Sequence, residues 1–424
     1  MVAMNLFMPG EGISETHVTW NDIEKSMQHE FQTKATLGPN RSARDIGDGK
    51  GYMSKVFLID ADWKNKDKQN LPDKFVLKVI TPIPWVKYTT QVSKLENSNN
   101  DFCQPTSMEF FEAFLKRAHN AEVAAYRHLS KLPEGKIQIP KIYDARDFCE
   151  RNTLKGYILM EYLENDKERE IFESFSLGEI RQLLRHLAVL EAASLDIPFK
   201  EMEHFFSGPF STLCTAFTLE EEREKVFAML MEHSGGKLAS KVARLRAIAH
   251  DMADNLKWAD ELPNKFNGMR SVLCHGDIYP MNTVWKKGAG EHKLVAVIDY
   301  QTCHFGCAAT DLVQIFVTFL SGKERRAHWE QLMEEFYGYL KQEVGTKKMP
   351  YSLEQLKEAY LQFFPTGAFT LIPFIAPLFE VIAKNVQQES KRKEYSEKVM
   401  EKVECLLDDL LQCHDRNLKI HVKN

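Results

Sequence analysis

The chain has 424 residues, of which 44% are hydrophobic and 27% charged, as is ordinary for a soluble globular protein, and its length favours two structural units. A formal net charge of −5 argues against nucleic acid as a partner, because nucleic-acid-binding surfaces are normally basic. No secretory signal is expected at the start, and eight cysteines without framework spacing indicate reduced thiols in a cytoplasmic protein.

Strand patterns and one long helix are predicted in the first 160 residues. Residues 19–31 predict a short helix capped by Thr19, with Asp22 three residues further on. After a polar, glycine-bearing region, apolar and β-branched residues predict an antiparallel hairpin made of KVFLIDADW and KFVLKVI. The other expected elements are a loop over 86–107, a helix over 108–130, and strands in KLPEGKIQIPKIYDARDF and GYILMEYL.

Helical patterns dominate from about residue 165 onward. They are interrupted by the mixed segment VLCHGDIYPMNTVW at 272–285 and by a strand pattern, KLVAVIDYQT. The uncharged run 363–379 is shorter than the roughly 20 residues of a membrane span and holds three prolines, which predicts buried helix and loop. The expected fold is α+β, with a small sheet-containing unit over 1–160 and a larger, mainly helical unit over 161–424.

Two features of the first part could contact phosphate. The glycine-rich segment 47–54 precedes a strand, and its backbone N–H groups and the Ser54 hydroxyl could approach phosphate oxygens, although a flexible turn has the same composition. Lys78 lies in the middle of an apolar strand, where a charge is unfavourable unless paired, the alternative being a lysine at a sheet edge. Glu122 on the long helix would be its partner, with Glu112 as a rival.

The segment 272–285 combines apolar flanks with His275, Asp277 and Asn282. Gly276 and Pro280 break any regular helix, so a shaped loop is predicted. Asp277 and Asn282 are separated by four residues, which lets a carboxylate face an incoming hydroxyl while the amide oxygen binds a divalent cation. His275 is expected to hold the loop through hydrogen bonds.

A further carboxylate, Asp299, ends the apolar strand that follows, where it could bind Mg²⁺ or simply cap a turn. The nearby segment with Cys303, His304 and Cys307 lacks a second ligand pair for zinc and is read as a loop. The succession of glycine loop, strand lysine, helix glutamate, Asp-x4-Asn and strand aspartate matches the arrangement of parts in protein kinases. A hydrolase using Asp277 and Asp299 would leave the lysine and the glycine loop unexplained.

HGDIYPMN with IDYQ downstream resembles the kinase-like phosphotransferases of small molecules, the choline and ethanolamine kinases and the aminoglycoside phosphotransferases. The chain is most similar to the CHK kinase-like group, which includes ecdysteroid-kinase-like proteins and a large nematode set. TWNDIEKSMQHEF with GPNRSARDIGDGKGYMSKV is similar to that nematode set. The resemblance covers nearly the whole chain and implies a bilobal protein-kinase-like fold that uses ATP and Mg²⁺.

The resemblance also implies roles for individual residues. Residues 161–424 would form the catalytic and substrate-binding lobe, in which Asp277 is the catalytic base or orients the substrate hydroxyl, and Asn282 and Asp299 hold Mg²⁺. Residues 1–160 would form the nucleotide-binding lobe. Its implied nucleotide contacts are made by Gly51, Ser54, Lys78 paired with Glu122, and the hinge backbone at Glu161 and Leu163.

Departures from the family pattern bear on the acceptor. Gln301 and Glu191 stand where choline kinases and many relatives have an acidic residue and a histidine, while Asp311 resembles the aspartate that braces the catalytic loop. The expected partner is a small-molecule alcohol, with neither nucleic acid nor a membrane span. Aromatic residues between Tyr360 and Phe379 favour a lipophilic acceptor, sterol-like or a glycoside. A choline or ethanolamine kinase and an inactive, ligand-binding kinase-like protein are the alternatives.

Overall fold

The computed structural model describes residues 5–47, 53–67, 70–86, 105–164, 169–214 and 219–421. The chain divides into an N-terminal unit, residues 1–133 with 139–164, and a C-terminal unit, residues 134–138 with 165–424. The segment 134–138 belongs to the C-terminal unit because the Gln138 carbonyl accepts a hydrogen bond from Val297 N (2.8 Å) and Lys136 pairs with Glu343 (2.6 Å).

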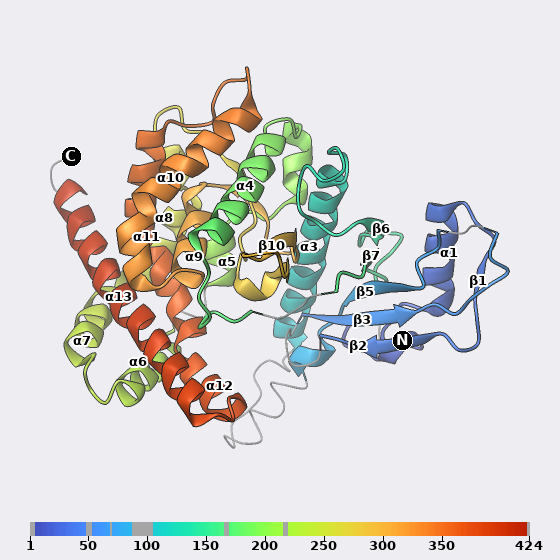
Figure 1. The fold of residues 1–424 in the computed structure, drawn as a ribbon, viewed down its shortest axis with the longest axis horizontal. Helices are drawn as coiled ribbons and strands as arrows, with labels where there is room; N and C mark the ends of the chain where they lie inside the picture. Colours follow the sequence, from blue (N-terminus) through green and yellow to red (C-terminus); the bar gives the residue numbers. More distant parts are fainter. Residues whose placement is uncertain are drawn as a thin grey trace. The chain divides into compact units, whose positions relative to one another are not determined.

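A five-stranded antiparallel sheet forms the N-terminal unit, with the strand order β2-β3-β5-β7-β6 (Figure 1). The predicted hairpin is confirmed as β3 and β5, paired from Ser54↔Ile80 to Asp60↔Lys74. The strands of this unit are β1 Thr36–Leu37, β2 Ser42–Asp45, β3 Ser54–Asp60, β4 Trp63–Lys64, β5 Lys74–Ile80, β6 Ile142–Arg146 and β7 Tyr157–Glu161. β2 lies in a region expected to be a polar loop, since an exposed edge strand shows no apolar alternation.

The long helices in the described part of this unit are α1 (Trp20–Phe31) and α3 (Pro105–Leu129). The predicted cap of α1 is confirmed: Asp22 N donates to Thr19 Oγ1 (3.3 Å) and Thr19 N donates to Asp22 Oδ2 (2.8 Å). α1 packs on one sheet face in a core that includes Ile23, Met27, Phe57, Ile59, Phe75 and Leu77. Because strand side chains alternate, Lys78 and Ile80 lie on the opposite face, where Ile80 joins a cluster with Leu115 of α3. The loop predicted over 86–107 lies largely outside the described residues.

The C-terminal unit is mainly helical, as predicted. Its helices are α4 Leu177–Ser194, α5 Pro209–Leu213, α6 Glu220–His233, α7 Ala239–Ile248, α8 Met252–Asp260, α9 Ala309–Thr318, α10 Gly322–Val344, α11 Leu353–Ile375, α12 Leu378–Asn385 and α13 Glu389–His421. Its strands form two antiparallel pairs, β8 (Val272–Cys274) with β11 (His304–Gly306) and β9 (Thr283–Lys286) with β10 (Lys293–Val297). The prediction that Cys303–Cys307 form a loop was wrong for His304–Gly306, because these residues form β11, which pairs with β8.

The uncharged run 363–379 was predicted to be helix and loop, but most of it is helical. α11 continues from Leu353 through Pro365 and Pro373 to Ile375 and packs against α9 and α13 (Figure 1). A proline inside a helix removes the hydrogen bond to the carbonyl four residues earlier, here that of Leu361. The Asn417 amide of α13 donates to the Leu361 and Gln362 carbonyls (3.2 Å each), so tertiary packing replaces the missing bond.

Removing this replacement should destabilise the protein. We expect Asn417→Ala to lower the free energy of unfolding by about 1–2 kcal/mol, because the Leu361 carbonyl loses its partner. In a Pro365→Ala background the same change should cost about half as much, since a restored amide at position 365 can bond to Leu361. Urea unfolding of the four proteins measures the coupling. Equal costs in the two backgrounds would contradict this account of the proline.

Among the residues that the structure describes, one stretch, Leu353–Asn385, is long and apolar enough to cross a membrane by composition. Within the C-terminal unit 67% of its most apolar window is buried, as in the core helix of a folded protein.

Candidate functional site

The segment that carries Asp277 is a loop between β8 and β9 that ends in a short 3-10 helix, Pro280–Asn282. Asp311, on the first turn of α9, accepts hydrogen bonds from His275 N (2.7 Å) and Gly276 N (2.9 Å). Burial raises the pKa of this carboxyl to about 6, against the opposing effect of the two backbone bonds. The brace that the resemblance implied for Asp311 is therefore present.

A second brace, Gln314, was missed in the sequence. Its Oε1 accepts from Ile278 N (3.1 Å) and its Nε2 donates to the Gly276 carbonyl (2.9 Å). Asp311 and Gln314 are three residues apart and thus lie on one helix face. This spacing was the available signal, and together the two side chains hold His275, Gly276 and Ile278 of the loop.

Local structure explains why a histidine stands at position 275 and a glycine at position 276. His275 is fully buried, and its Nδ1 accepts from Asp277 N (3.2 Å), so Nε2 carries the proton and donates to the Ile298 carbonyl (3.1 Å). These are the loop-holding contacts expected of this histidine. Gly276 has φ +83°, and a Cβ there would lie 2.6 Å from the Thr302 carbonyl oxygen. Backbone conformation alone therefore requires this glycine.

The three polar residues Asp277, Asn282 and Asp299 are gathered by the β9–β10 hairpin. Asn282 Nδ2 donates to the Asp277 carbonyl (2.8 Å) and to Asp277 Oδ2 (3.0 Å), which orients its Oδ1 as the atom for a cation. Thr283 pairs with Val297, and Ile298 N donates to the Asn282 carbonyl (2.9 Å). Asn282 and Asp299 consequently emerge at the same end of the hairpin.

Asp299 has φ +69°, a left-handed conformation that is uncommon for residues other than glycine and concentrates at functional sites. The described part of the chain contains no group of three or more His, Cys, Asp or Glu residues that could hold a metal ion. Mg²⁺ is commonly held by one or two protein oxygen ligands plus phosphates and water. An amide oxygen and a carboxylate at one hairpin end fit that pattern.

Replacing Asp311 with asparagine is expected to loosen the loop, because the amide presents a donor to one of two backbone N–H groups. The free energy of unfolding of the wild-type protein should also depend on pH through the Asp311 carboxyl. Its pKa is raised from 3.8 to about 6, so between these values the folded protein keeps a proton that the unfolded chain has lost. The contribution of Asp311 to the free energy of unfolding therefore falls as pH rises from about 4 to 6, by up to about 3 kcal/mol, and is constant above.

Denaturant unfolding of wild type and Asp311→Asn between pH 4 and 7 measures this difference. A stability difference between the two proteins that does not change with pH would contradict the assignment.

In the N-terminal unit, Lys78 Nζ donates to both oxygens of the Glu122 carboxylate, at 2.9 and 2.7 Å. The two side chains are 7% and 0% exposed, so the pair is buried. The rival Glu112 instead pairs with Lys116 (2.6 Å), one turn away on α3. The expected contact is present, and the role of Lys78 in phosphate binding stays a prediction.

An apolar surface shares the sheet face of Lys78. Val76 lies opposite Leu58 on β3 and Met160 on β7, and all three are nearly buried. Sequence reasoning did not single out these residues, although positions 76 and 78 must share a face in a strand. A flat apolar surface beside a fixed lysine suits an adenine ring next to its phosphates.

The other predicted nucleotide contacts lie in the sequence near the start of β3 and near the end of β7. Gly51 lies outside the described residues, and Ser54 begins β3 opposite Ile80. The Glu161 amide already donates to the Lys141 carbonyl (2.8 Å). The adenine contacts predicted for the backbone at Glu161 and Leu163 stay predictions.

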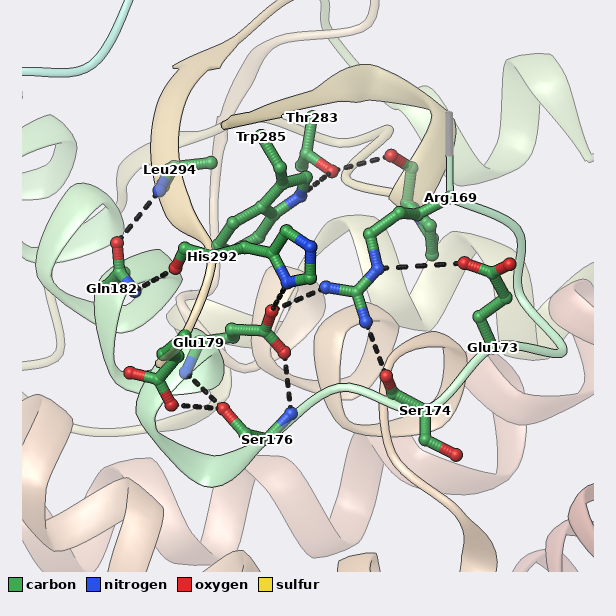
Figure 2. Close-up of polar contacts among 12 residues, drawn as sticks. Arg169, Glu173, Ser174, Ser176, Glu179, Gln182, Thr283, Trp285, His292 and Leu294 are labelled. Atoms are coloured by element: carbon green, nitrogen blue, oxygen red, sulfur yellow. Dashed lines mark hydrogen bonds and ion pairs between the residues drawn. The ribbon is translucent and has the colours of Figure 1, made fainter. Parts of the chain in front are cut away.

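A buried network in the C-terminal unit anchors the segment that begins at Arg169 (Figure 2). The Arg169 guanidinium lies 3.7 Å from the Phe175 ring centre and donates to Glu179 Oε1 (2.6 Å), which also contacts His292 Nδ1 (2.9 Å). Glu179 Oε2 accepts from Ser176 N (2.7 Å) in a capping box of α4.

The same network extends to the hairpin that follows the loop of Asp277. Gln182 of α4 bonds to the His292 carbonyl (2.9 Å) and Leu294 N (2.8 Å), which fixes the start of β10 (Figure 2). On β9, Trp285 Nε1 donates to Thr283 Oγ1 (2.7 Å), which donates to the Pro280 carbonyl (2.6 Å). The hairpin that presents Asn282 and Asp299 is thus held at both ends.

Known proteins resemble this chain at low identity. "Uncharacterized kinase-like protein D1044.1" of Caenorhabditis elegans is 23% identical over 399 residues, 92% of this chain and 96% of that protein. "Uncharacterized oxidoreductase dhs-27" of the same organism is 24% identical over 338 residues, 77% of this chain. The chain spans only 38% of that second relative, so the activity in its name belongs to a longer protein.

Solved structures of small-molecule kinases match most of the chain, with TM-scores below 0.5. Choline kinase from Cryptosporidium parvum matches 89% of this chain and 91% of its own, with 11% identity and a TM-score of 0.46. The GDP complex of aminoglycoside 2'-phosphotransferase-IIIa matches 90% and 99% (11% identity, TM-score 0.41), and Plasmodium vivax ethanolamine kinase 95% and 90% (12%, 0.40).

The predicted membership in a nematode kinase-like set is confirmed. The family described as "DUF1679: Uncharacterized oxidoreductase dhs-27" matches residues 6–418, and the chain belongs to it.

Proposed function

We propose that this protein is an ATP- and Mg²⁺-dependent phosphotransferase that phosphorylates a hydroxyl group of a small molecule. The observation that carries the proposal is the braced loop, in which Asp277 is hydrogen-bonded to Asn282 at the hairpin end that also presents Asp299. A structural loop has no need of a carboxylate, an amide and a strained aspartate at one point. Lys78 of the buried Lys78–Glu122 pair would supply the cation that phosphate binding requires.

The reaction assigns one task to each group. The Asp277 carboxylate accepts the proton of the acceptor hydroxyl. At the same time the hydroxyl oxygen bonds to the γ-phosphorus, and the bond between that phosphorus and the leaving ADP breaks. Asn282 holds Asp277 in position through its amide group. Mg²⁺ held by Asn282 and Asp299 would neutralise charge on the phosphates. Lys78, fixed by Glu122, would donate to phosphate oxygens.

Exposed apolar groups around the loop favour a lipophilic acceptor, sterol-like or a glycoside. Met281 is 56% exposed, next to Asn282, and Phe374 of α11 is 51% exposed. The Phe374 ring contacts that of Tyr279, two residues after Asp277 (6.0 Å between centres). The other aromatic residues of the segment 360–379 are core residues, each at most 8% exposed: Tyr360, Phe363, Phe364, Phe369 and Phe379.

A choline or ethanolamine kinase is the narrower alternative. A quaternary ammonium binds in an aromatic cage that usually has acids nearby. Glu191 stands where many members of the resembled family have a histidine, and it is buried and hydrogen-bonded to the Tyr351 hydroxyl. Desolvation raises the pKa of Glu191 well above its usual value, so burial disfavours the charged form of this carboxyl. A buried carboxyl that already binds a tyrosine hydroxyl is poorly placed to attract a bound cation, which favours the lipophilic acceptor.

Purified protein with labelled ATP and Mg²⁺ tests the proposal against a panel of sterols, glycosides, long-chain alcohols, choline and ethanolamine. Phosphate transfer to lipophilic hydroxyls is expected, together with loss of transfer when Mg²⁺ is chelated. Turnover of choline alone would overturn the acceptor class. Nucleotide binding without turnover of any alcohol would identify an inactive binding protein, and absence of nucleotide binding would overturn the proposal altogether.

A further inference from the structure

A cavity of about 980 Å³ lies in the C-terminal unit, apart from the site described above. Its walls come from α7, α10, α11 and the second half of α13, and no residue of the 272–299 segment contributes to them. This volume is at the upper end of the range for small-molecule sites, which is roughly 300–1,000 Å³. It is much larger than an inorganic anion needs.

The walls are positively charged, although the whole chain carries a net charge of −5. Six cationic and three carboxylate side chains line the cavity. Two of the cations also pair with carboxylates outside the walls, Lys241 with Glu404 and Arg416 with Glu358. Lys419, on the last turns of α13, is exposed and makes no ion pair within the described ranges. The electrostatic character favours an anion.

Two hydrogen-bond donors of the wall have no partner in the described chain. Arg325 is 2% exposed, and Asp409 Oδ2 engages its Nε (3.2 Å) and Nη2 (2.7 Å) but not its Nη1. The Tyr360 hydroxyl, on a residue that is also 2% exposed, likewise has no hydrogen-bond partner among the described residues. Unsatisfied buried donors are unfavourable, and both of these require an acceptor oxygen.

Aromatic rings adjoin these donors. The Tyr360 ring is stacked on Trp329, with 5.2 Å between centres and 9° between planes. The Arg325 guanidinium lies 5.5 Å from the centre of the Phe364 ring. The wall of the cavity therefore combines unpaired donors with neighbouring aromatic rings, the pattern of a site for a molecule with an acidic head and an apolar body.

We propose that this cavity binds a small organic anion whose acidic oxygen accepts hydrogen bonds from Arg325 and Tyr360 and whose apolar body lies against the neighbouring aromatic rings. Because the two donor atoms are shielded from solvent, the wall side chains must move slightly to admit the acceptor oxygen, which then has little competition from water. The Asp409 ion pair fixes the orientation of the guanidinium. The site does not depend on the phosphotransferase proposal, since none of its groups takes part in that reaction.

Calorimetric titration of the full chain with 2-naphthalenesulfonate tests the site. We expect one bound molecule per chain. The uncharged 2-naphthalenesulfonamide and inorganic sulfate should each bind at least about tenfold more weakly, since one lacks the charge and the other the apolar body. A saturating, non-hydrolysable ATP analogue with Mg²⁺ should leave sulfonate affinity unchanged, which keeps this site separate from the nucleotide site.

Tyr360→Phe is the informative variant, because it removes the hydroxyl without breaking any hydrogen bond of the described chain. It should weaken sulfonate binding about tenfold and leave the melting temperature within a few degrees of wild type. Tyr339→Phe is the matched control, on α10 but outside the cavity walls, and should bind like wild type. Undetectable sulfonate binding at millimolar concentration, equal binding by the sulfonamide or by sulfate, competition by the nucleotide, or full affinity in Tyr360→Phe would each overturn the proposal.

Discussion

Replacing Asp277 with asparagine is expected to lower phosphotransferase turnover by about 10²–10⁴-fold, the usual contribution of a positioned general base. Asparagine has the size of aspartate, and its side-chain oxygen can still accept from Asn282 Nδ2, as the carboxylate does at 3.0 Å. The loop should therefore keep its shape while the proton acceptor is lost. Steady-state turnover with the best acceptor of the panel and circular dichroism of the variant measure the two effects separately.

A matched control for this change is Asp254→Asn, an exposed aspartate on α8 of the same unit. It loses the same charge far from the loop in sequence and should retain wild-type turnover. An Asp277→Asn protein that is folded and as active as wild type would remove Asp277 from the mechanism. If Asp277→Asn is both inactive and unfolded, turnover is measured instead in Asp277→Glu, which keeps the carboxylate.

Breaking the Lys78–Glu122 pair should have the largest effect on stability. Removing one member of a buried ion pair leaves an uncompensated charge and typically costs about 3–5 kcal/mol. Lys78→Met and Glu122→Leu should each lower the free energy of unfolding by that amount. The double variant should recover much of the loss, because both charges are then absent from a site where they are 7% and 0% exposed.

The same helix offers a control. Lys116 pairs with Glu112 across one turn of α3, with side chains 26% and 14% exposed, and Lys116→Met should cost less than about 1 kcal/mol. Additive losses in the Lys78→Met/Glu122→Leu protein would show that the pair is not coupled. ATP affinity gives a second readout, which should fall in every variant lacking Lys78 and remain in Lys116→Met.

Local sequence determined the elements whose contacts span only a few residues. The Thr19–Asp22 cap, the β3–β5 hairpin and the shaped loop around Gly276 and Pro280 follow from caps, alternation and helix breakers. These signals act between neighbours along the chain, so their geometry is nearly the same in any fold. The residue types at Asp277, Asn282 and Asp299 could be read in the same way, because one hairpin presents them.

Tertiary structure decided which distant groups meet. Both Glu112 and Glu122 lie on α3, and only the folded unit brings Glu122 to Lys78, 44 positions away. α11 runs through Pro365 because Asn417, 56 positions from Leu361, supplies the missing hydrogen bond. The Gln314 brace, the Arg169–Glu179 contact and the cavity beside Tyr360 likewise join groups from separate elements. Such contacts depend on how helices and strands pack, and composition or periodicity along one segment carries no information about its partner.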